Sequence, residues 1–472
     1  MSDGGRGRVM GRSIHRGGTS AAFAGSKCPI RAAWTAAIPD GWHVVPLRAV
    51  ADYEVSNVDK KVRDGELPVR LCNYVDVYKN EFITLDLDFM EATAGKDEIT
   101  KFRLQIGDVL ITKDSESWDD IGVPALVQET ADDLICGYHL ARIRPRPAQI
   151  DGGFLLRCLQ AKPIRLHLEL SANGVIRFGL PKGRIGLTPL PLPPLATQRA
   201  IADYLDGETA LIDALIAAKR KLLAILAEKR RAQVTDAVTR GLDPSVPMRD
   251  SGIPWLGEIP AHWGVTRLKF VADVQGGLAL GKKYGTAEPL QECPYLRVAN
   301  VQDGFLDLLE VRTVKVSEHD AQSCRLQAGD VLMNEGGDAD KLGRGAIWRG
   351  EIEHCLHQNH VFAVRPRAAI SEWLNLWTSS EGAKAFFESR AKQSTKLASI
   401  SVSNLKELPI PCPPPGEQRS IVLRVASQTQ RIDDMAGANC ATIQLLQERR
   451  QAIIAAAVTG QVELEGPPGY GE

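Results

Sequence analysis

The feature that most constrains this chain is an internal repeat. The segment "IPDGWHVVPL" at 38–47 is answered by "IPAHWGVTRL" at 259–268, 221 residues further along. Four more pairs follow in the same order at offsets of 220 to 222: "IGDVLIT" with "AGDVLMN", "HLARIRPRP" with "HVFAVRPRA", "PLPPLATQRAI" with "PCPPPGEQRSI", and "EKRRAQVTDAVT" with "ERRQAIIAAAVT". Five ordered matches predict two tandem copies of a unit of about 200 residues, which is too long for a solenoid repeat.

Composition sets the broad class of the protein. With 472 residues, 44% hydrophobic and 24% charged, the chain has the makeup of a soluble protein of two or three domains. No apolar run approaches the roughly 18 residues of a membrane span, so we expect no membrane association and a cytoplasmic location. Nine scattered cysteines without a CxxC pair favour buried thiols over disulfides. The net charge of −1 argues mildly against binding DNA by bulk charge, and it is compatible with a localised basic groove.

Each copy divides into a head and a helix. The heads contain short β-branched runs that end in turn residues, with a helical pattern at 370–391, which predicts an α+β domain. A proline cluster then precedes 40 to 45 residues almost free of proline and glycine. We therefore predict two tandem-repeated α+β heads separated by a long antiparallel pair of helices, with approximate two-fold symmetry.

An apolar seam runs along each predicted helix with coiled-coil spacing. Its expected members are Leu205, Ile212, Leu215, Leu222 and Leu226 in the first helix, and Val425, Ile432, Met435, Leu446 and Ile453 in the second. A lone helix of roughly 65 Å has little to bury such a seam against, so we expect the two helices to pack on each other. Packing of each helix on its own head is the alternative.

The repeat also gives the expected boundaries. These are a disordered N-terminal extension (1–36), the first head (37–190), a central spacer helix (191–240), a linker (241–258), the second head (259–412), a C-terminal spacer helix (413–460) and a tail (461–472). A basic arm that touches DNA is the other interpretation of the extension. The repeated tryptophans, Trp42 and Trp263, are expected to seal the joint between head and helix.

The chain resembles the specificity subunit of type I restriction–modification systems over about 36–465. The segments that carry the resemblance include "LCNYVDVYKNEFIT", "GDVLITKDSESWDDIGVPALV", "EKRRAQVTDAVTRGLDP" and "MRDSGIPWLGEIPAHW". The resemblance implies that each head is a target-recognition domain reading part of a double-stranded DNA site. It also implies that the helices act as a ruler and dock two methyltransferase subunits, which translocase–nuclease subunits join. AdoMet, ATP and Mg²⁺ would belong to those partners.

Motifs for chemistry within the chain itself are weak. No Asn or Asp precedes a Pro-Pro pair as an adenine methyltransferase requires, and "GGLALGKK" (276–283) has Lys283 where a phosphate loop has Ser or Thr. "HCLHQNH" (354–360) makes a metal site conceivable, although only one histidine recurs in the other copy. Asp108 and Asp330 of the "GDVL" segments are better explained by a tight turn than by a nuclease. We therefore expect no catalytic, cofactor or metal site in this chain.

DNA-contacting residues are expected where the copies diverge, since two heads that read different half-sites need different side chains. Recurrent lysine pairs suggest phosphate contacts. The predicted set is Lys60, Lys61, Thr112, Lys113, Ser115 and Arg177 in the first head, and Lys282, Lys283, Asn334, Arg344, Gln393, Ser394, Thr395 and Lys396 in the second. An ordinary exposed loop is the alternative for each of them.

Three functions remain open from the sequence. The first is a non-catalytic DNA-recognition and scaffold subunit. The second is a single-chain nuclease or methylase, which the missing catalytic motifs oppose. The third is a structural coiled-coil adaptor, for which two different heads are superfluous. The first alone requires methyltransferase partners, so a pull-down separates them.

Overall fold

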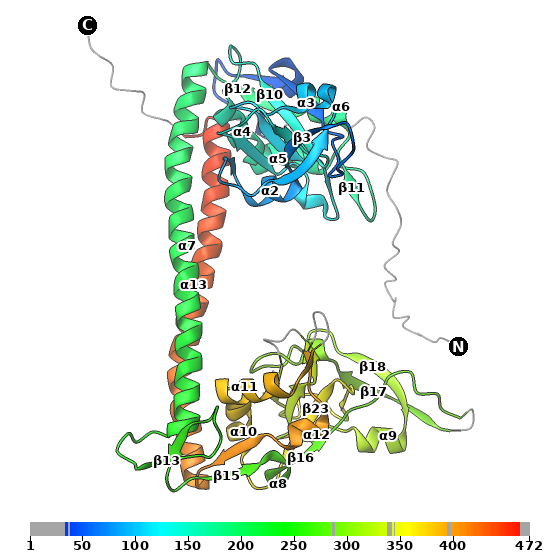
Figure 1. Ribbon diagram of the computed structural model, residues 1–472, viewed down its shortest axis with the longest axis vertical. Helices are drawn as coiled ribbons and strands as arrows, with labels where there is room; N and C mark the ends of the chain where they lie inside the picture. The colour runs from blue at the N-terminus through cyan, green and yellow to red at the C-terminus, as the bar shows by residue number, and fades with distance from the viewer. Residues whose placement is uncertain are drawn as a thin grey trace, which may run out of the picture. The chain divides into compact units, whose positions relative to one another are not determined.

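The computed structural model describes residues 34–35, 38–285, 288–337, 342–343, 345–393 and 398–462 (Figure 1). The chain forms two compact units, residues 1–216 with 443–472 (unit 1) and residues 217–442 (unit 2). Each unit holds one head and a part of both long helices. The mixture of sheets and helices in two repeated heads, with a 46-residue helix between them in the sequence, confirms the predicted fold class.

Unit 1 is built on a five-stranded sheet of order β2-β10-β6-β8-β4. Its centre consists of β10 (Leu140–Pro145) paired antiparallel with β6 (Val109–Thr112), and all four residues of β6 are buried. An unbroken apolar run is what a central strand covered on both faces requires. The flanking strands are β2 (Ala51–Val55), β8 (Pro124–Val127) and β4 (Phe82–Ile83).

A second sheet and several short helices complete the first head. The sheet β5-β3-β9 consists of β5 (Met90–Ala94), β3 (Leu67–Cys72) and β9 (Leu134–Cys136). The other elements are β1 (His43–Pro46), η1 (Leu47–Ala49), α2 (Tyr74–Lys79), α3 (Lys96–Phe102), β7 (Asp114–Ser115), η2 (Trp118–Asp120), α4 (Gly152–Gln160), α5 (Lys162–Glu169), β11 (Phe178–Gly179), α6 (Lys182–Gly186) and β12 (Pro189–Leu192).

Unit 2 repeats this plan with a sheet of order β16-β23-β19-β21. These strands are β16 (Ala272–Gln275), β23 (Val361–Pro366), β19 (Val331–Asn334) and β21 (Gly345–Ile347). A second sheet, β18-β17-β22, matches the second sheet of unit 1, with one antiparallel and one parallel neighbour of its middle strand in both units. The repeat in sequence is therefore a repeat of fold.

The remaining elements of unit 2 largely match those of unit 1 in order, with the added strands β13 and β14 before them. They are β13 (Met248–Asp250), β14 (Glu258–Pro260), β15 (Gly264–Arg267), α8 (Leu268–Val271), β17 (Leu290–Leu296), η3 (Val298–Asn300), β18 (Arg312–Ser317), α9 (Glu318–Ser323), β20 (Gly336–Gly337), β22 (Leu356–His357), α10 (Ser371–Thr378), α11 (Glu381–Arg390), β24 (Lys392–Gln393), β25 (Ala398–Ser399), α12 (Val402–Lys406) and β26 (Pro409–Cys412).

The two "GDVL" carboxylates form the same buried ion pair in both heads. Asp108 and Asp330 are each 1% exposed. Arg144 donates to both oxygens of Asp108 at 2.7 Å, and Arg365 does the same to Asp330 at 2.7 Å. The preceding glycine has a positive φ in both turns, which only glycine adopts at little cost. The structural interpretation of these carboxylates is therefore confirmed.

The long helices α7 (Leu195–Arg240) and α13 (Pro415–Val458) pair antiparallel within each unit. In unit 2, Lys219 contacts Asn439 at 3.2 Å and Arg230 pairs with Asp433 at 3.1 Å. Rising numbers on one helix thus meet falling numbers on the other. The expectation that the helices pack on each other is met. In each unit, both helices also pack on the head.

The predicted seam is half right. Leu205, Ile212 and Leu226 are buried in α7, but Leu215 is 46% exposed and Ile216 takes its place. In α13, Val425 and Ile432 are buried, Leu446 and Ile453 are partly buried, and Met435 is 51% exposed. Leu222 is partly buried beside Leu223. Along the observed seam a step of four residues comes first and a step of three follows, which reverses the predicted order. Every second buried position therefore lies one residue later than predicted.

Both joints use the repeated tryptophans as expected. Trp263 is 1% exposed and packs in one core cluster with Val234 and Val238 of α7. Trp42 is partly buried against the cluster that contains Ala457 and Val458 of α13. The apolar rings close the end of each helix against its head.

Two predicted boundary segments differ from expectation. The segment 241–258 is more than a linker, because β13 pairs with β14 and Leu256 enters the core of unit 2. Trp34, placed in the extension by sequence, is 6% exposed and packs in the core of unit 1. Residues 1–33, 36–37 and 463–472 lie outside the described part of the chain. No helix among the described residues is long and apolar enough to cross a membrane.

Candidate nucleic-acid interface

The first head carries a surface pocket that gathers several of the residues singled out in the sequence. It has a volume of about 750 Å³. The loop that carries Lys60 and Lys61 forms one side, Tyr74 at the start of α2 another, and the turn with Tyr138 and His139 a third. The two lysines stand beside three carboxylates of the same lining, Asp59, Asp76 and Asp88. The lysines and the tyrosine rings are the groups suited to contact phosphates and planar bases.

His139 connects this pocket to the divergent loops. Its Nδ1 lies 3.1 Å from Oδ2 of Asp114, and Nη2 of Arg177 lies 2.9 Å from its Nε2. Lys113 also binds Asp114. Pairing of β7 with β11 brings these residues together, since Ser115 lies opposite Phe178 in that ladder. The structure therefore places Lys113 and Arg177 around His139 and its partner Asp114, while Ser115 contacts Tyr74 and Asp120.

The charges of this cluster are held in one arrangement. Burial lowers the pKa of His139, and the neighbouring Arg177 lowers it further, against the opposing effect of Asp114. Burial works to raise the pKa of Asp114, but hydrogen bonds from Lys113 and His139 outweigh it and the pKa is lowered. A neutral ring that donates from Nδ1 to Asp114 and accepts from Arg177 at Nε2 satisfies both partners.

Two tyrosines that sequence reasoning missed border the same surface. Tyr74 and Tyr78 stack with ring centroids 5.4 Å apart. Tyr74 lies 3.3 Å from Oγ of Ser115, and Tyr78 donates to Asp120 at 2.9 Å. The signal was present in "NYVDVYKN", because a spacing of four residues puts both rings on one face of a helix.

Two predicted base-reading residues are not exposed. Thr112 is fully buried, and its hydroxyl donates to the carbonyl of Asp120 at 2.6 Å. Asn334 is 5% exposed and donates to the carbonyl of Val301 at 2.9 Å. They are the equivalent last residues of β6 and β19. Thr112 ties down the loop that follows β6, whereas Asn334 bonds the chain just after η3. The expectation of an exposed polar tip is not met at either position.

The second head presents a related but different surface. His360 contacts Glu335 at 2.6 Å, at the place where the first head has His139 and Asp114. Lys282 binds both oxygens of Asp320, at 2.9 and 2.6 Å, and Tyr284 donates to the same carboxylate at 2.8 Å. Lys282 is thus engaged in an ion pair, whereas Lys283 is exposed.

The rest of the predicted set in the second head is only partly covered. Gln393 lies in β24, and Arg344, Ser394, Thr395 and Lys396 lie outside the described residues. Of the conceivable metal ligands, His357 is buried with Nδ1 2.6 Å from the carbonyl of Val361. No group of three or more His, Cys, Asp or Glu that is suited to a metal occurs within the described part.

Comparison with known proteins finds similar proteins of one class. Residues 260–433 match the model of the type I restriction modification DNA specificity domain. The EcoKI specificity subunit of Escherichia coli K12 is 24% identical over 441 residues, 90% of either chain. The StySPI specificity subunit of Salmonella potsdam is 23% identical with the same coverage. The chain is therefore similar, along most of its length, to DNA-specificity subunits of type I restriction enzymes.

A solved structure supports the fold independently. A chain described under "complex assembly and conformational transition of the type I R-M system" aligns with a TM-score of 0.60 and 20% identity, covering 90% of this chain and 99% of that one. The resemblance to type I restriction–modification specificity subunits is confirmed by the matching domain model and by the two relatives that align along 90% of the chain.

Proposed function

We propose that each head reads one half of a bipartite DNA target, while the helix pair sets the spacing and docks two methyltransferase subunits. The observation that carries the reading role is the first head's surface. There, Lys60 and Lys61 share a pocket with His139, and His139 holds Arg177. Lysine, arginine and aromatic side chains are thus grouped locally, beside three pocket aspartates, in a chain whose net charge is −1.

The roles within this surface follow from side-chain chemistry. Lysines act as point charges and position the duplex on its phosphates. Arg177 has a planar fork that matches the O6 and N7 acceptors of guanine. In the second head, His360 with Glu335 has the equivalent place, and the different neighbours of the two histidines are suited to different half-sites.

The helices offer a surface for protein partners. Large apolar side chains lie exposed on both helices away from the seam: Leu211, Leu215, Leu423, Met435 and Leu445. Such side chains favour a further protein contact. We assign this surface to the methyltransferase subunits, with translocase–nuclease subunits added to that assembly. AdoMet, ATP and Mg²⁺ would be bound by those partners and not by this chain.

The methylome of a host otherwise free of DNA methylation tests the proposal. The chain is co-expressed with its methyltransferase, and modified bases are mapped by long-read sequencing. We expect a two-part motif with a fixed gap. Arg177→Ala should alter one part and leave the other unchanged. A complex that forms without any motif, or modification by this chain alone, contradicts the proposal.

A further inference from the structure

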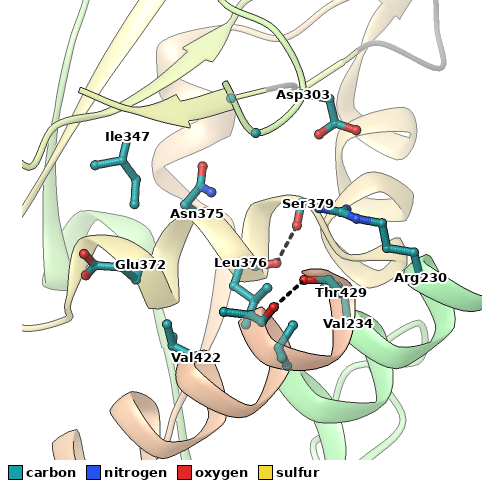
Figure 2. Close-up of a pocket in the computed structure, with 14 residues that line it drawn as sticks. Arg230, Val234, Asp303, Ile347, Glu372, Asn375, Leu376, Ser379, Val422 and Thr429 are labelled. Atoms are coloured by element: carbon teal, nitrogen blue, oxygen red, sulfur yellow. Dashed lines mark hydrogen bonds between the residues drawn. The ribbon is translucent and has the colours of Figure 1, made fainter. Parts of the chain in front are cut away.

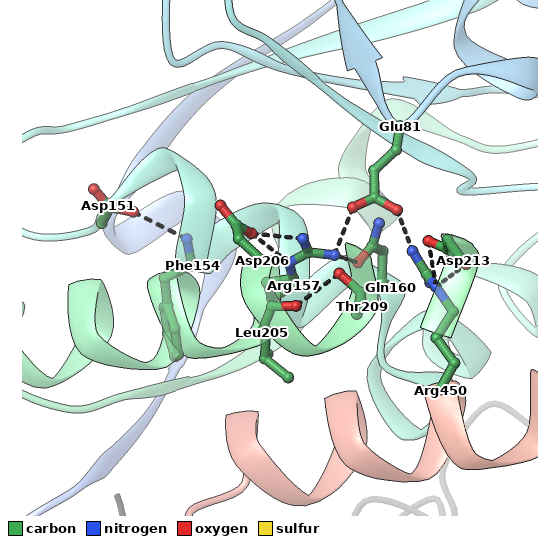
Figure 3. A network of polar contacts seen from close by, with 10 residues as sticks. All are labelled: Glu81, Asp151, Phe154, Arg157, Gln160, Leu205, Asp206, Thr209, Asp213 and Arg450. Carbon is green, nitrogen blue, oxygen red and sulfur yellow. Dashed lines mark hydrogen bonds and ion pairs between the residues drawn. The ribbon is translucent and has the colours of Figure 1, made fainter. Parts of the chain in front are cut away.

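The first head is fastened to the helices through one buried arginine (Figure 3). Arg157 of α4 is 1% exposed. Its guanidinium donates to Asp206 of α7 at 3.1 and 2.5 Å, and to Glu81 and Gln160 of the head at 2.6 and 2.8 Å. Head and helix thus share one charged group.

The network continues to the second helix of unit 1. The other oxygen of Glu81 binds Arg450 of α13. Arg450 in turn pairs with Asp213 of α7 at 3.1 Å. Three elements that meet at this joint, the head, α7 and α13, are linked by an unbroken series of ion pairs (Figure 3).

Unit 2 keeps only the outer pair of this network. Its Arg230 and Asp433 stand 220 residues from Arg450 and Asp213, and they pair at 3.1 Å. The heads are in matching register here, because the amide of Asp151 donates to Gln198 and the amide of Ile370 donates to Gln418.

The centre of the network is missing in unit 2. With Asp151 opposite Ile370, Leu376 takes the position of Arg157. Ala426 takes the position of Asp206, 220 residues away. The guanidinium and the carboxylate that clamp the first head are therefore replaced by two apolar side chains.

A cavity occupies this place in unit 2 (Figure 2). Its volume is about 200 Å³. Its walls include Leu376, Ala426, Arg230 and Asp303, from the head and from both helices. Within the described residues, no ion pair joins Asp303 to Arg230.

The two joints have different mechanical consequences. A buried guanidinium with several charged acceptors is strongly directional, so a tilt of the head would leave buried charges unpaired. Close packing resists motion, but a cavity at a contact removes that resistance on one side. The second head is held to α7 by apolar packing and by the exposed ion pair of Arg231 with Glu381 at 3.5 Å. Because exposed ion pairs contribute little, the buried network makes the seat of the first head the stiffer one.

We propose that Arg157 is a positioning residue that holds the first head on the helices. The second head tilts on the helices because a cavity takes the place of the equivalent ion pairs. Given the proposed function, the first head is the fixed reference and the second adjusts to its half-site. The inference about stiffness itself does not depend on DNA.

Spin-label distance measurements on the full chain test the clamp. Labels are placed at exposed, equivalent sites: Thr100 with Ala210 in unit 1, and Gln322 with Gln430 in unit 2, with Cys28 and Cys440 replaced by serine. We expect the head-to-helix distance distribution of unit 2 to be about twofold broader than that of unit 1. Equal widths would overturn the proposal.

Reciprocal variants assign the difference to the clamp. Arg157→Met should broaden the unit 1 distribution, and Leu376→Arg with Ala426→Asp should narrow that of unit 2. The grafted pair keeps the proposal testable if Arg157→Met fails to fold. A graft that folds, by circular dichroism, without narrowing the distribution contradicts it. Once the methylome gives the target, Arg157→Met should methylate sites whose gap is one base pair longer or shorter, whereas destabilisation alone would not change gap preference.

Discussion

At the scale of single residues, the two heads share the same side-chain interactions more often than they share identical residues. The carboxylate–arginine pairs of Asp108 and Asp330 occupy the same buried turn in both heads. The partners of His139 and His360 come from neighbouring positions of the same loop, Asp114 in one head and Glu335 in the other. A structural pair is retained, while the surface around the histidine varies.

The buried pair predicts an asymmetric mutational response. Arg144→Met leaves Asp108 buried without its guanidinium, which should lower the free energy of unfolding by roughly 3–5 kcal/mol. Asp108→Asn combined with Arg144→Met removes both charges and should cost less. Urea unfolding of the two variants measures this difference, and a double variant as unstable as the single one would contradict it.

The histidine cluster predicts a pH response with a definite sign. Because the pKa of His139 is lowered by folding, its contribution to stability is full above about pH 6.5 and declines as the pH falls through the folded pKa. The pKa of Asp114 is also lowered by folding, so its contribution to stability is lost at a lower pH still.

Nuclear magnetic resonance titration of His139 gives the direct measurement. We expect a midpoint below 6.5. Asp114→Asn should lower the midpoint further, because the carboxylate favours the imidazolium. Arg177→Met should raise it by removing a positive neighbour. A shift of the opposite sign in either variant would refute the assigned network.

At the scale of elements, the helix pair shows how burial selects among apolar residues. Ile216 is buried and Leu215 exposed, although both are good seam residues by sequence. The predicted helix at 370–391 is instead two helices, α10 and α11, separated where Ser380 caps the second. Trp373, Trp377 and Phe387 lie in the core, so the helical pattern was correct and the break between the two helices was missed.

The shifted seam predicts which helix residues matter for stability. Ile212→Ala or Ile432→Ala should lower the free energy of unfolding by about 2–5 kcal/mol, since each removes buried methylenes and leaves a cavity. Leu215→Ala and Met435→Ala are the matched controls. They should change stability by less than about 1 kcal/mol and should weaken methyltransferase binding instead. Thermal unfolding and a pull-down separate these effects.

At the scale of the whole molecule, α7 and α13 each pass from one unit to the other. If they set the gap in the DNA target, their length should be readable in the motif. Deleting seven residues from each at facing positions, 220–226 and 435–441, keeps the seam in phase and removes about 10 Å. The gap in the methylome should shorten by about three base pairs. An unchanged gap would exclude the ruler.

The sequence by itself determined the architecture, because that information is periodic and repeated. The 220-residue offset predicted two heads, the proline-free segments predicted two long helices, and the repeated tryptophans predicted the joints. Such features depend on local residue spacing and on apolar patterning, and both can be read directly from one amino-acid sequence. The resemblance to specificity subunits rested on the same repeated segments.

The tertiary structure alone decided which side chains meet. Thr112 and Asn334 are polar residues in divergent loops, but strand ends bury them. Arg157, Glu81 and Arg450 are far apart in the chain and form one network, while in unit 2 a cavity lies where Leu376 replaces Arg157. Long-range contacts of this kind depend on how elements are seated on one another. The way the elements pack on one another is determined by side-chain packing and by buried charges. Neither produces a periodic pattern in the sequence from which it could be predicted.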